Sequence, residues 1–203
     1  MTDNESGAPA RTLHGPPLSE HAARRQRFLD EFTGGVLFLP PVAEAVFAAD
    51  VHYRYRPDTN IRYLAGFEEP CALLLAADGS DEEGFTLCVE PRDEHSLVWT
   101  GPRAGIEGAK NIFGADHAFE LKSAMDHLAV HLPRAKRFFY AYSAAPHVNE
   151  RVLAAVSTAN VARRRAGGDP LAVEDATDVL GEMRLIKSTS EAQLMREAAT
   201  VSS

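Results

Sequence analysis

The chain alternates between short, continuous apolar runs and longer segments in which apolar residues recur at helical spacing. Three of the runs are bounded by turn residues and predict strands that are covered on both faces of a sheet. These runs are Val36–Leu39, Cys71–Ala77 and Phe85–Val89. The last two flank an acidic turn over residues 78–84, which predicts an antiparallel hairpin with a solvated tip.

Apolar residues at helical spacing predict a first helix between Ser19, its expected N-cap, and Phe32. Arg24, Arg25 and Arg27 are expected on the solvated side of this helix. The further predicted helices are Ile106–Phe113, Leu121–Leu132 and His147–Thr158.

Further strands are predicted over Ile61–Ala65, Leu97–Trp99 and Arg137–Tyr142, and residues 163–170 are predicted to form a loop. Helices and strands alternate in the second half of the chain, whereas the first half contains the hairpin. This order predicts an α/β fold, in which helices flank a mixed sheet with an antiparallel hairpin.

Length and composition restrict the class of protein. The chain has 203 residues, 45% of them apolar, and a net charge of −8, which argues against a nucleic-acid partner. No apolar run reaches the ~18 residues that span a bilayer, and residues 1–17 resemble a disordered leader rather than a signal peptide. Cys71 and Cys88 both lie in apolar runs, so we expect buried free thiols and a cytoplasmic protein.

The run Ser188-Thr189-Ser190-Glu191 has the spacing of a capping box, in which two side chains satisfy free backbone donors at a helix start. The helical pattern that follows continues to Ser203 without a stop signal. We therefore expect the natural chain to continue beyond this residue.

Other candidates for chemistry are weaker. His127 and His131 lie four residues apart, a spacing that suits two zinc ligands, but no catalytic glutamate lies between them. A solvated helix face is the favoured interpretation of this pair. The arginines of residues 163–165 are interpreted in the same way, as a solvated loop in an acidic protein.

Residues 50–70 combine tyrosines, arginines and turn residues, and Trp99 lies among Arg92, Arg103 and a Gly-Pro turn. Residues 50–70 are either an edge strand and a loop packed by aromatic side chains or a functional loop. Trp99 either packs in the core or has a role at a surface or pocket. The residues alone leave both open.

The two stretches and the capping-box region resemble three motifs of the N-terminal domain of aminopeptidase P, the Xaa-Pro aminopeptidases, in the same order and at similar spacing. The first contains Tyr53, Tyr55, Arg56, Asp58, Thr59, Tyr63, Leu64, Gly66, Phe67, Glu69 and Pro70; the second contains Arg92, Asp93, Trp99, Gly101 and Arg103; the third runs from Glu182 to Ser188 and includes Glu191. Ile61 and Ala65 depart from the usual pattern, where an aromatic residue and a threonine are common.

The resemblance implies a six-stranded mixed sheet over residues 18–180. It also implies that residues 181–203 lead into a second, pita-bread catalytic domain. That domain would bind two metal ions, usually manganese, through two Asp, one His and two Glu residues that lie beyond Ser203. We therefore expect no catalytic and no metal-binding residue in this chain, and no activity of the isolated chain.

The resemblance further implies that the domain forms homodimers or homotetramers, packs on its own catalytic domain and restricts access to short proline-containing peptides. By motif position, Trp99 is expected to form an apolar wall near the substrate and Asp50 a polar contact at the subunit junction. Tyr53, Arg56 and Arg103 are further candidates for substrate binding. The alternatives are a stand-alone module that binds peptides or proteins without catalysis, and the N-terminal domain of a prolidase or creatinase.

Overall fold

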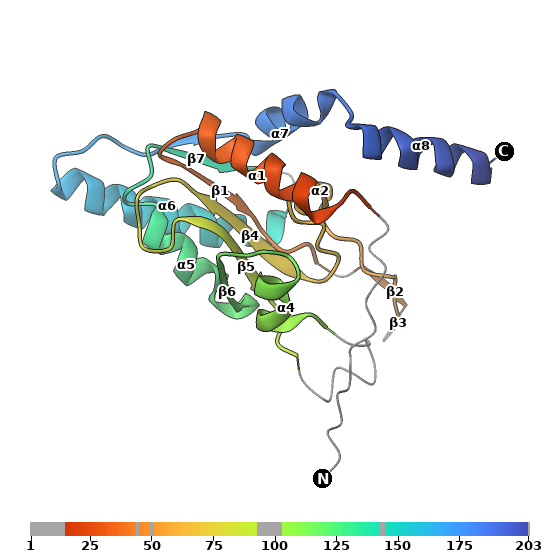
Figure 1. The fold of residues 1–203 in the computed structure, drawn as a ribbon. Coiled ribbons are helices and arrows are strands. Elements are labelled where there is room, and N and C mark those ends of the chain that lie inside the picture. The colour runs from red at the N-terminus through yellow and green to blue at the C-terminus, as the bar shows by residue number, and fades with distance from the viewer. Residues whose placement is uncertain (1–14, 44, 49–50, 93–102, 143–144, 203) are drawn as a thin grey trace, which may run out of the picture.

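Six strands form one mixed sheet with the order β6-β5-β4-β1-β7-β8, and Figure 1 labels each of them except β8. The computed structural model describes residues 15–43, 45–48, 51–92, 103–142 and 145–202, and only the backbone of residues 46, 51 and 52. Within the sheet, β4 runs antiparallel to both of its neighbours, and every other pair is parallel. The strands are β1 (Gly35–Leu39), β4 (Cys71–Ala76), β5 (Gly84–Val89), β6 (His117–Glu120), β7 (Arg137–Tyr140) and β8 (Ala172–Glu174). A separate two-stranded ribbon pairs β2 (Val46–Ala48) with β3 (Val51–His52).

Helices cover both faces of the sheet, and the last helix extends away from it (Figure 1). One face is packed by α1 (Leu18–Glu31), α2 (Thr59–Ala65), α4 (Gly105–Asn111) and α7 (Ala176–Leu185). The other is packed by α5 (Ala124–His131) and α6 (Asn149–Arg165), each of which follows a short 3₁₀ turn. Helix α8 (Thr189–Ser202) has no buried residue.

The continuous apolar runs form two cores because successive side chains of a strand point to opposite faces. In β1, Leu37 and Leu39 belong to the core beneath α1, whereas Val36 and Phe38 belong to the core beneath α5 and α6. A strand covered on both faces has no solvated position, so its sequence shows no polar alternation. The prediction of an α/β fold with a mixed sheet and an antiparallel hairpin is confirmed.

The two cysteines are buried and unbridged. Cys88 lies opposite Ala72 in the β4–β5 ladder, and the two thiols face different cores. A disulfide between them would therefore require their side chains to cross the sheet. Burial raises the pKa of Cys88 to about 12 and that of Cys71 further still.

We expect neither thiol to react with a disulfide reagent such as DTNB in the native protein, because the attacking species is the thiolate. Both should react after denaturation in guanidinium chloride, which provides the control for reagent and protein. Titration of even one thiol within seconds under native conditions would contradict the buried placement of the two strands.

One predicted strand is a helix. Residues 61–65 lie in α2, where Ile61, Leu64 and Ala65 are buried at the spacing of one helix face. Asp58 caps its start by accepting hydrogen bonds from the backbone N–H groups of Asn60 and Ile61, at 2.7 and 3.4 Å. The predicted strand is wrong because Asp58 caps a helix here and the buried residues follow helical spacing.

Several boundaries and exposures also differ from prediction. Pro17, not Ser19, occupies the N-cap of α1. Arg24 and Arg25 are buried rather than solvated. The arginines of residues 163–165 lie in the last turn of α6, where Arg163 donates hydrogen bonds to the carbonyls of Pro133 and Ala135. The predicted strand at residues 97–99 falls outside the described residues.

Strands β6 and β8 and helix α7 were not predicted. The two strands are short and pair at the edges of the sheet, so neither carries a continuous apolar run.

In the described part of the chain, no helix is both long enough and apolar enough to cross a membrane.

Candidate functional site at the carboxyl edge and the α1–α2–α8 junction

The first and second motifs meet at one edge of the sheet. Strands β1, β5, β6 and β7 all end there, and the antiparallel strand β4 begins there. The segments that lead into β4 and out of β5 are therefore neighbours, although they are distant in sequence. We call this side of the molecule the carboxyl edge.

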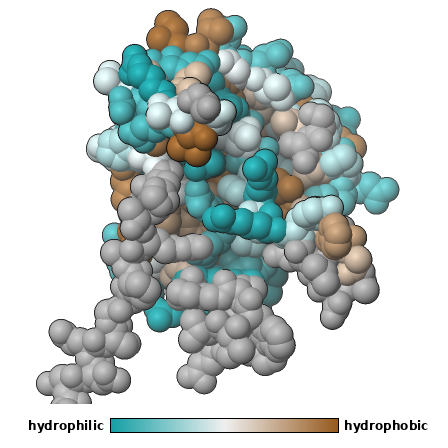
Figure 2. Space-filling model, turned by 90° about the vertical axis from the view of Figure 1, so that its right-hand side faces the viewer, coloured by the Kyte–Doolittle hydropathy of each residue, from teal (hydrophilic) through white to brown (hydrophobic). Residues whose placement is uncertain are grey.

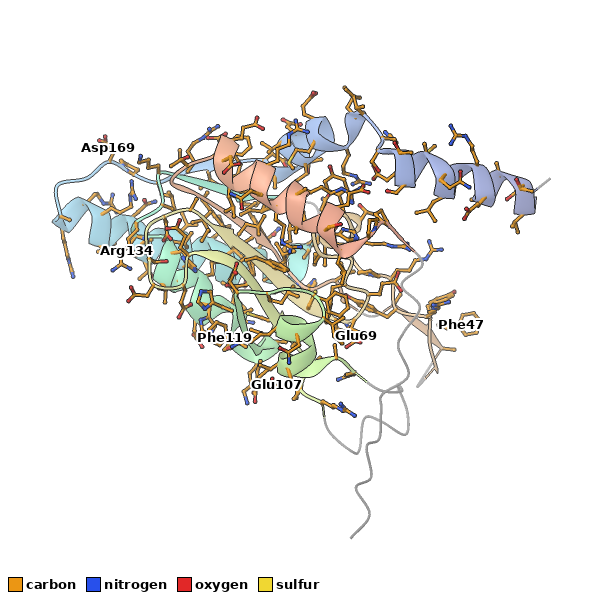
Figure 3. The ribbon with its side chains drawn as sticks, in the orientation of Figure 1. Phe47, Glu69, Glu107, Phe119, Arg134 and Asp169 are labelled. Atoms are coloured by element: carbon orange, nitrogen blue, oxygen red, sulfur yellow. The ribbon has the colours of Figure 1, made fainter. Side chains whose placement is uncertain are left out.

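Glu69 connects the first motif to the residue that follows the second. Its carboxylate accepts hydrogen bonds from the backbone N–H of Ala104, at 3.1 and 3.2 Å, at the start of α4 (Figure 3). A carboxylate at a helix N-terminus is favoured by the free N–H groups and the helix dipole. The adjacent Arg103 lies 3.8 Å from Glu90, which follows β5. Among the candidates for substrate binding, Arg103 thus forms a partly buried ion pair within its own edge.

The other described candidates are exposed. Tyr53 is 56% exposed, and its ring meets that of Phe47 edge to face at 5.3 Å. Phe47 lies on the β2–β3 ribbon, away from the body of the sheet (Figure 3). Arg56 is also exposed. Asp50 and Trp99 fall outside the described residues, so their expected roles stay predictions.

The end of α2 is bound by side chains of α1. His21 and Arg24 both donate to the carbonyl of Tyr63, at 2.8 and 2.9 Å, and Arg25 donates to that of Leu64 at 2.8 Å. The last carbonyls of a helix have no partner within it, and cations are favoured there. This explains why two arginines of α1 are buried.

The same helix binds the start of α8. Glu20 forms an ion pair with Arg24 and accepts a hydrogen bond from the hydroxyl of Ser190, and Arg24 also lies 3.1 Å from Glu191. The predicted capping box is confirmed: the Ser188 N–H donates to the Glu191 carboxylate at 2.9 Å, and the Glu191 N–H to the Ser188 hydroxyl at 3.2 Å. We call Glu20, Arg24, Ser190 and Glu191 the α8 anchor.

Burial opposes ionisation of Glu20, but the Ser188 and Ser190 hydroxyls and the Arg24 guanidinium outweigh it and lower the pKa of this carboxyl. Glu20 is therefore charged at neutral pH.

The third motif contacts the first. Arg184 donates to the side-chain oxygens of Thr59 and Asn60, at 3.2 and 2.9 Å, and the Tyr63 hydroxyl donates to the carbonyl of Met183 at 2.9 Å. Residues of α1, α2, α7 and α8 line an open cavity of about 670 Å³ beside these contacts. Much of the first motif thus holds α2 to its neighbours.

His21 is expected to make the domain less stable in mild acid. Burial lowers the pKa of His21 below its usual 6.5, and Arg24 and Arg25 lower it further, although the bond to the Tyr63 carbonyl acts in the opposite direction. The unfolded chain then binds a proton that the native chain lacks, so the free energy of unfolding falls as pH drops below about 6.5, by at most ~1.4 kcal/mol per pH unit.

Urea unfolding of the protein between pH 7.5 and 5.5 measures this slope. The His21→Asn variant should have a shallower slope, whereas His147→Asn, which alters an exposed histidine, should keep that of the wild type. Equal slopes in all three proteins would show that His21 does not titrate in this range.

The two histidine side chains of α5 bind different partners. His127 Nδ1 lies 2.8 Å from Glu82, and the buried His131 Nδ1 lies 3.1 Å from both Asp78 and Ser80. The predicted solvated helix face is wrong for His131, because the tip of the β4–β5 hairpin covers it. Over the described ranges, no group of three or more His, Cys, Asp or Glu side chains is placed to hold a metal ion.

Sequence reasoning missed the α8 anchor and the buried cations of α1. The capping box marked Ser188 and Glu191, but nothing local marked their partners on α1, more than 160 residues away. The glutamate-arginine spacing of Glu20 and Arg24 is common on solvated helices and gave no signal of burial.

The fold agrees with comparisons to known proteins. The family described as the aminopeptidase P N-terminal domain matches residues 21–140. The chain belongs to this family.

Among curated relatives, the Xaa-Pro aminopeptidase of Haemophilus influenzae is 29% identical over 188 residues, which cover 91% of this chain and 41% of the relative. The Xaa-Pro aminopeptidase 3 of Dictyostelium discoideum is 35% identical over 112 residues, 53% of this chain and 21% of that protein. The solved structure of Pseudomonas aeruginosa aminopeptidase PepP has a TM-score of 0.82 at 30% identity and covers 92% of this chain and 42% of its own. The chain thus spans less than half the length of these relatives.

Proposed function

We propose that this chain is the N-terminal domain of a manganese-dependent Xaa-Pro aminopeptidase of the cytoplasm, which removes the residue that precedes proline at a peptide N-terminus. In this proposal the domain forms part of a homodimer or homotetramer and limits access to short peptides. Two manganese ions would be bound by a catalytic domain beyond Ser203, where they would activate the attacking water.

The observation that carries the proposal is the arrangement of α8. Its first turn is fixed by the α8 anchor and the capping box, yet none of its residues is buried. The neighbouring apolar side chains Leu185, Ile186, Met195 and Val201 are exposed, and Figure 2 shows hydrophobic groups among hydrophilic ones at the top of the molecule, where α7 and α8 lie. Exposed apolar surface of this kind is typical of an interface. Because the relatives are more than twice as long, a second domain is the partner that we propose for it.

The gating role rests on the carboxyl edge. The exposed rings of Phe47 and Tyr53 offer apolar surface on and beside the β2–β3 ribbon that follows β1, and Arg56 is also exposed. We propose that this surface, with Trp99 and Asp50, borders the active site of a neighbouring subunit, while Arg103 holds the edge in shape through Glu90.

The gene downstream of Ser203 provides the first test. An open frame that encodes two Asp, one His and two Glu ligands is expected, whereas a stop codon would favour the stand-alone binding module. The isolated 203-residue chain, given Mn²⁺ and a tripeptide with proline at its second position, should release no amino acid above a blank without protein. Hydrolysis by this chain alone would overturn the proposal.

The full-length protein tests the gating role. Tyr53→Ala and Trp99→Ala should each raise KM for the tripeptide at least threefold, while Tyr142→Ala, which alters an exposed tyrosine of another segment, should leave it unchanged. Activity on an Xaa-Pro dipeptide in preference to the tripeptide would instead indicate a prolidase.

A further inference from the structure

A second cavity, of about 400 Å³, lies at the carboxyl edge on the side of the sheet covered by α5 and α6. None of its lining residues belongs to the candidates for substrate binding discussed above. Its volume falls within the range of small-molecule sites. Its floor is apolar and includes the buried Phe38 and Val148.

The topology of the sheet makes this a favoured place for a ligand. Strands β1 and β7 are adjacent and parallel, but the chain leaves β1 toward β4 on one side and leaves β7 toward β8 on the other. In open α/β sheets, ligands bind in the crevice outside the carboxyl ends of two such strands. Phe38 and Pro41 at the end of β1, and His147 and Val148 after β7, line the cavity.

The acidic and basic side chains of the cavity come from different strand ends, except that Lys122 lies beside Glu120. Glu90 and Glu120 come from the ends of β5 and β6, whose ladder pairs Val89 with Glu120. Arg151 and His147 come from the connection that follows β7. Three strand spacings separate the ends of β5 and β7, which is about 14 Å.

Glu90 and Arg151, which come from opposite ends of the cavity, can each still form hydrogen bonds with a ligand. Glu90 lies 3.8 Å from Arg103, too far for a hydrogen bond, so its carboxylate can still accept from a ligand. Glu120, in contrast, binds Lys122 at 2.5 Å. Arg151 is exposed, and no carboxylate of the described chain forms an ion pair with it. Its planar guanidinium suits bidentate binding of a carboxylate.

We propose that this cavity binds a short peptide of two to four residues with free ends, its ammonium group on Glu90 and its terminal carboxylate on Arg151. An extended tripeptide is about 10 Å long, and a hydrogen bond of about 3 Å at each end brings the total to about 16 Å, close to the spacing of the two strand ends. The apolar floor contacts the middle side chain. This site needs residues of this chain alone and does not depend on a peptidase domain.

NMR titration of the 203-residue chain with Ala-Val-Ala tests the proposal. The peptide contains no proline and the readout is binding, so failure here leaves the proposed peptidase function untouched. Chemical shifts of residues around Val148 and Leu121 should change on titration. N-acetylation or C-terminal amidation of the peptide should each weaken binding about tenfold.

The variants identify which group binds which end. Glu90→Gln should weaken the free tripeptide about tenfold yet leave the N-acetylated peptide unaffected, and Arg151→Gln should behave in the same way toward the amidated peptide. Matched controls are Glu107→Gln on α4 and Arg134→Gln, which precedes β7 and lies at the opposite edge (Figure 3). Equal binding of all three peptides, equal binding by all variants, or no shift at millimolar peptide would each overturn the proposal.

Discussion

Replacing Arg24 with methionine is expected to lower the free energy of unfolding by about 3 kcal/mol. Arg24 is buried and binds Glu20, Glu191 and the carbonyl of Tyr63 at once. Methionine fills similar space but leaves two carboxylates without their cation and one helix-end carbonyl with a single donor. The carboxylates keep some contact with solvent, so the loss falls at the lower end of the range for a broken buried pair.

Chemical denaturation measures this loss, and amide hydrogen exchange locates it. Exchange should accelerate in the first turn of α8 and at the end of α2, since Arg24 is the side chain that contacts both. The matched control is Arg27→Met on the same helix, because Arg27 is 60% exposed and lies 3.9 Å from Glu31. That change should cost under ~0.5 kcal/mol. Similar losses in both variants would mean that α1 does not bind α8 in solution.

Gly66→Ala is expected to destabilise the domain by a comparable amount, about 3 kcal/mol. Gly66 ends α2 in the left-handed conformation, with φ of +64°, which costs a residue with a Cβ about 1–2 kcal/mol. The new Cβ would also lie 2.8 Å from Nε2 of His21. This ring cannot move aside without breaking its bond to the Tyr63 carbonyl.

Gly79→Ala separates the cost of the left-handed conformation from the cost of the close contact with His21. Gly79 has a similar φ of +74°, but nothing lies within 4 Å of its added Cβ, so this variant should lose only the conformational part, about 1–2 kcal/mol. In a His21→Ala background, Gly66→Ala should likewise fall to the cost of Gly79→Ala. If the two glycine variants are equally unstable in the wild-type background, the close contact of α1 with α2 is not formed.

The contacts of Arg24 and Gly66 change the interpretation of the first motif. Asp58 caps α2, Gly66 ends it, Tyr63 receives the side chains of α1, and Glu69 binds the start of α4. These four residues of the motif therefore hold α2 and its neighbours in place. The exposed Tyr53 and Arg56 are the ones left available for a partner.

The sequence by itself determined the parts of the fold that depend on local pattern. Continuous apolar runs identified β1, β4 and β5, because a strand covered on both faces leaves no polar position. The capping box identified the start of α8, because its two hydrogen bonds join residues three apart. Motif order identified the family, and the apolar context of both cysteines indicated free buried thiols.

Only the tertiary structure decided which polar residues are buried and what they bind. Arg24 and Glu20 have a spacing typical of a solvated helix, and their burial depends on the end of α2 and the start of α8 lying beside them. His131 is covered by a hairpin tip about 50 residues away in sequence. The residues that line the second cavity come from the ends of four strands. They become neighbours only when the sheet assembles, because no local pattern encodes the strand order.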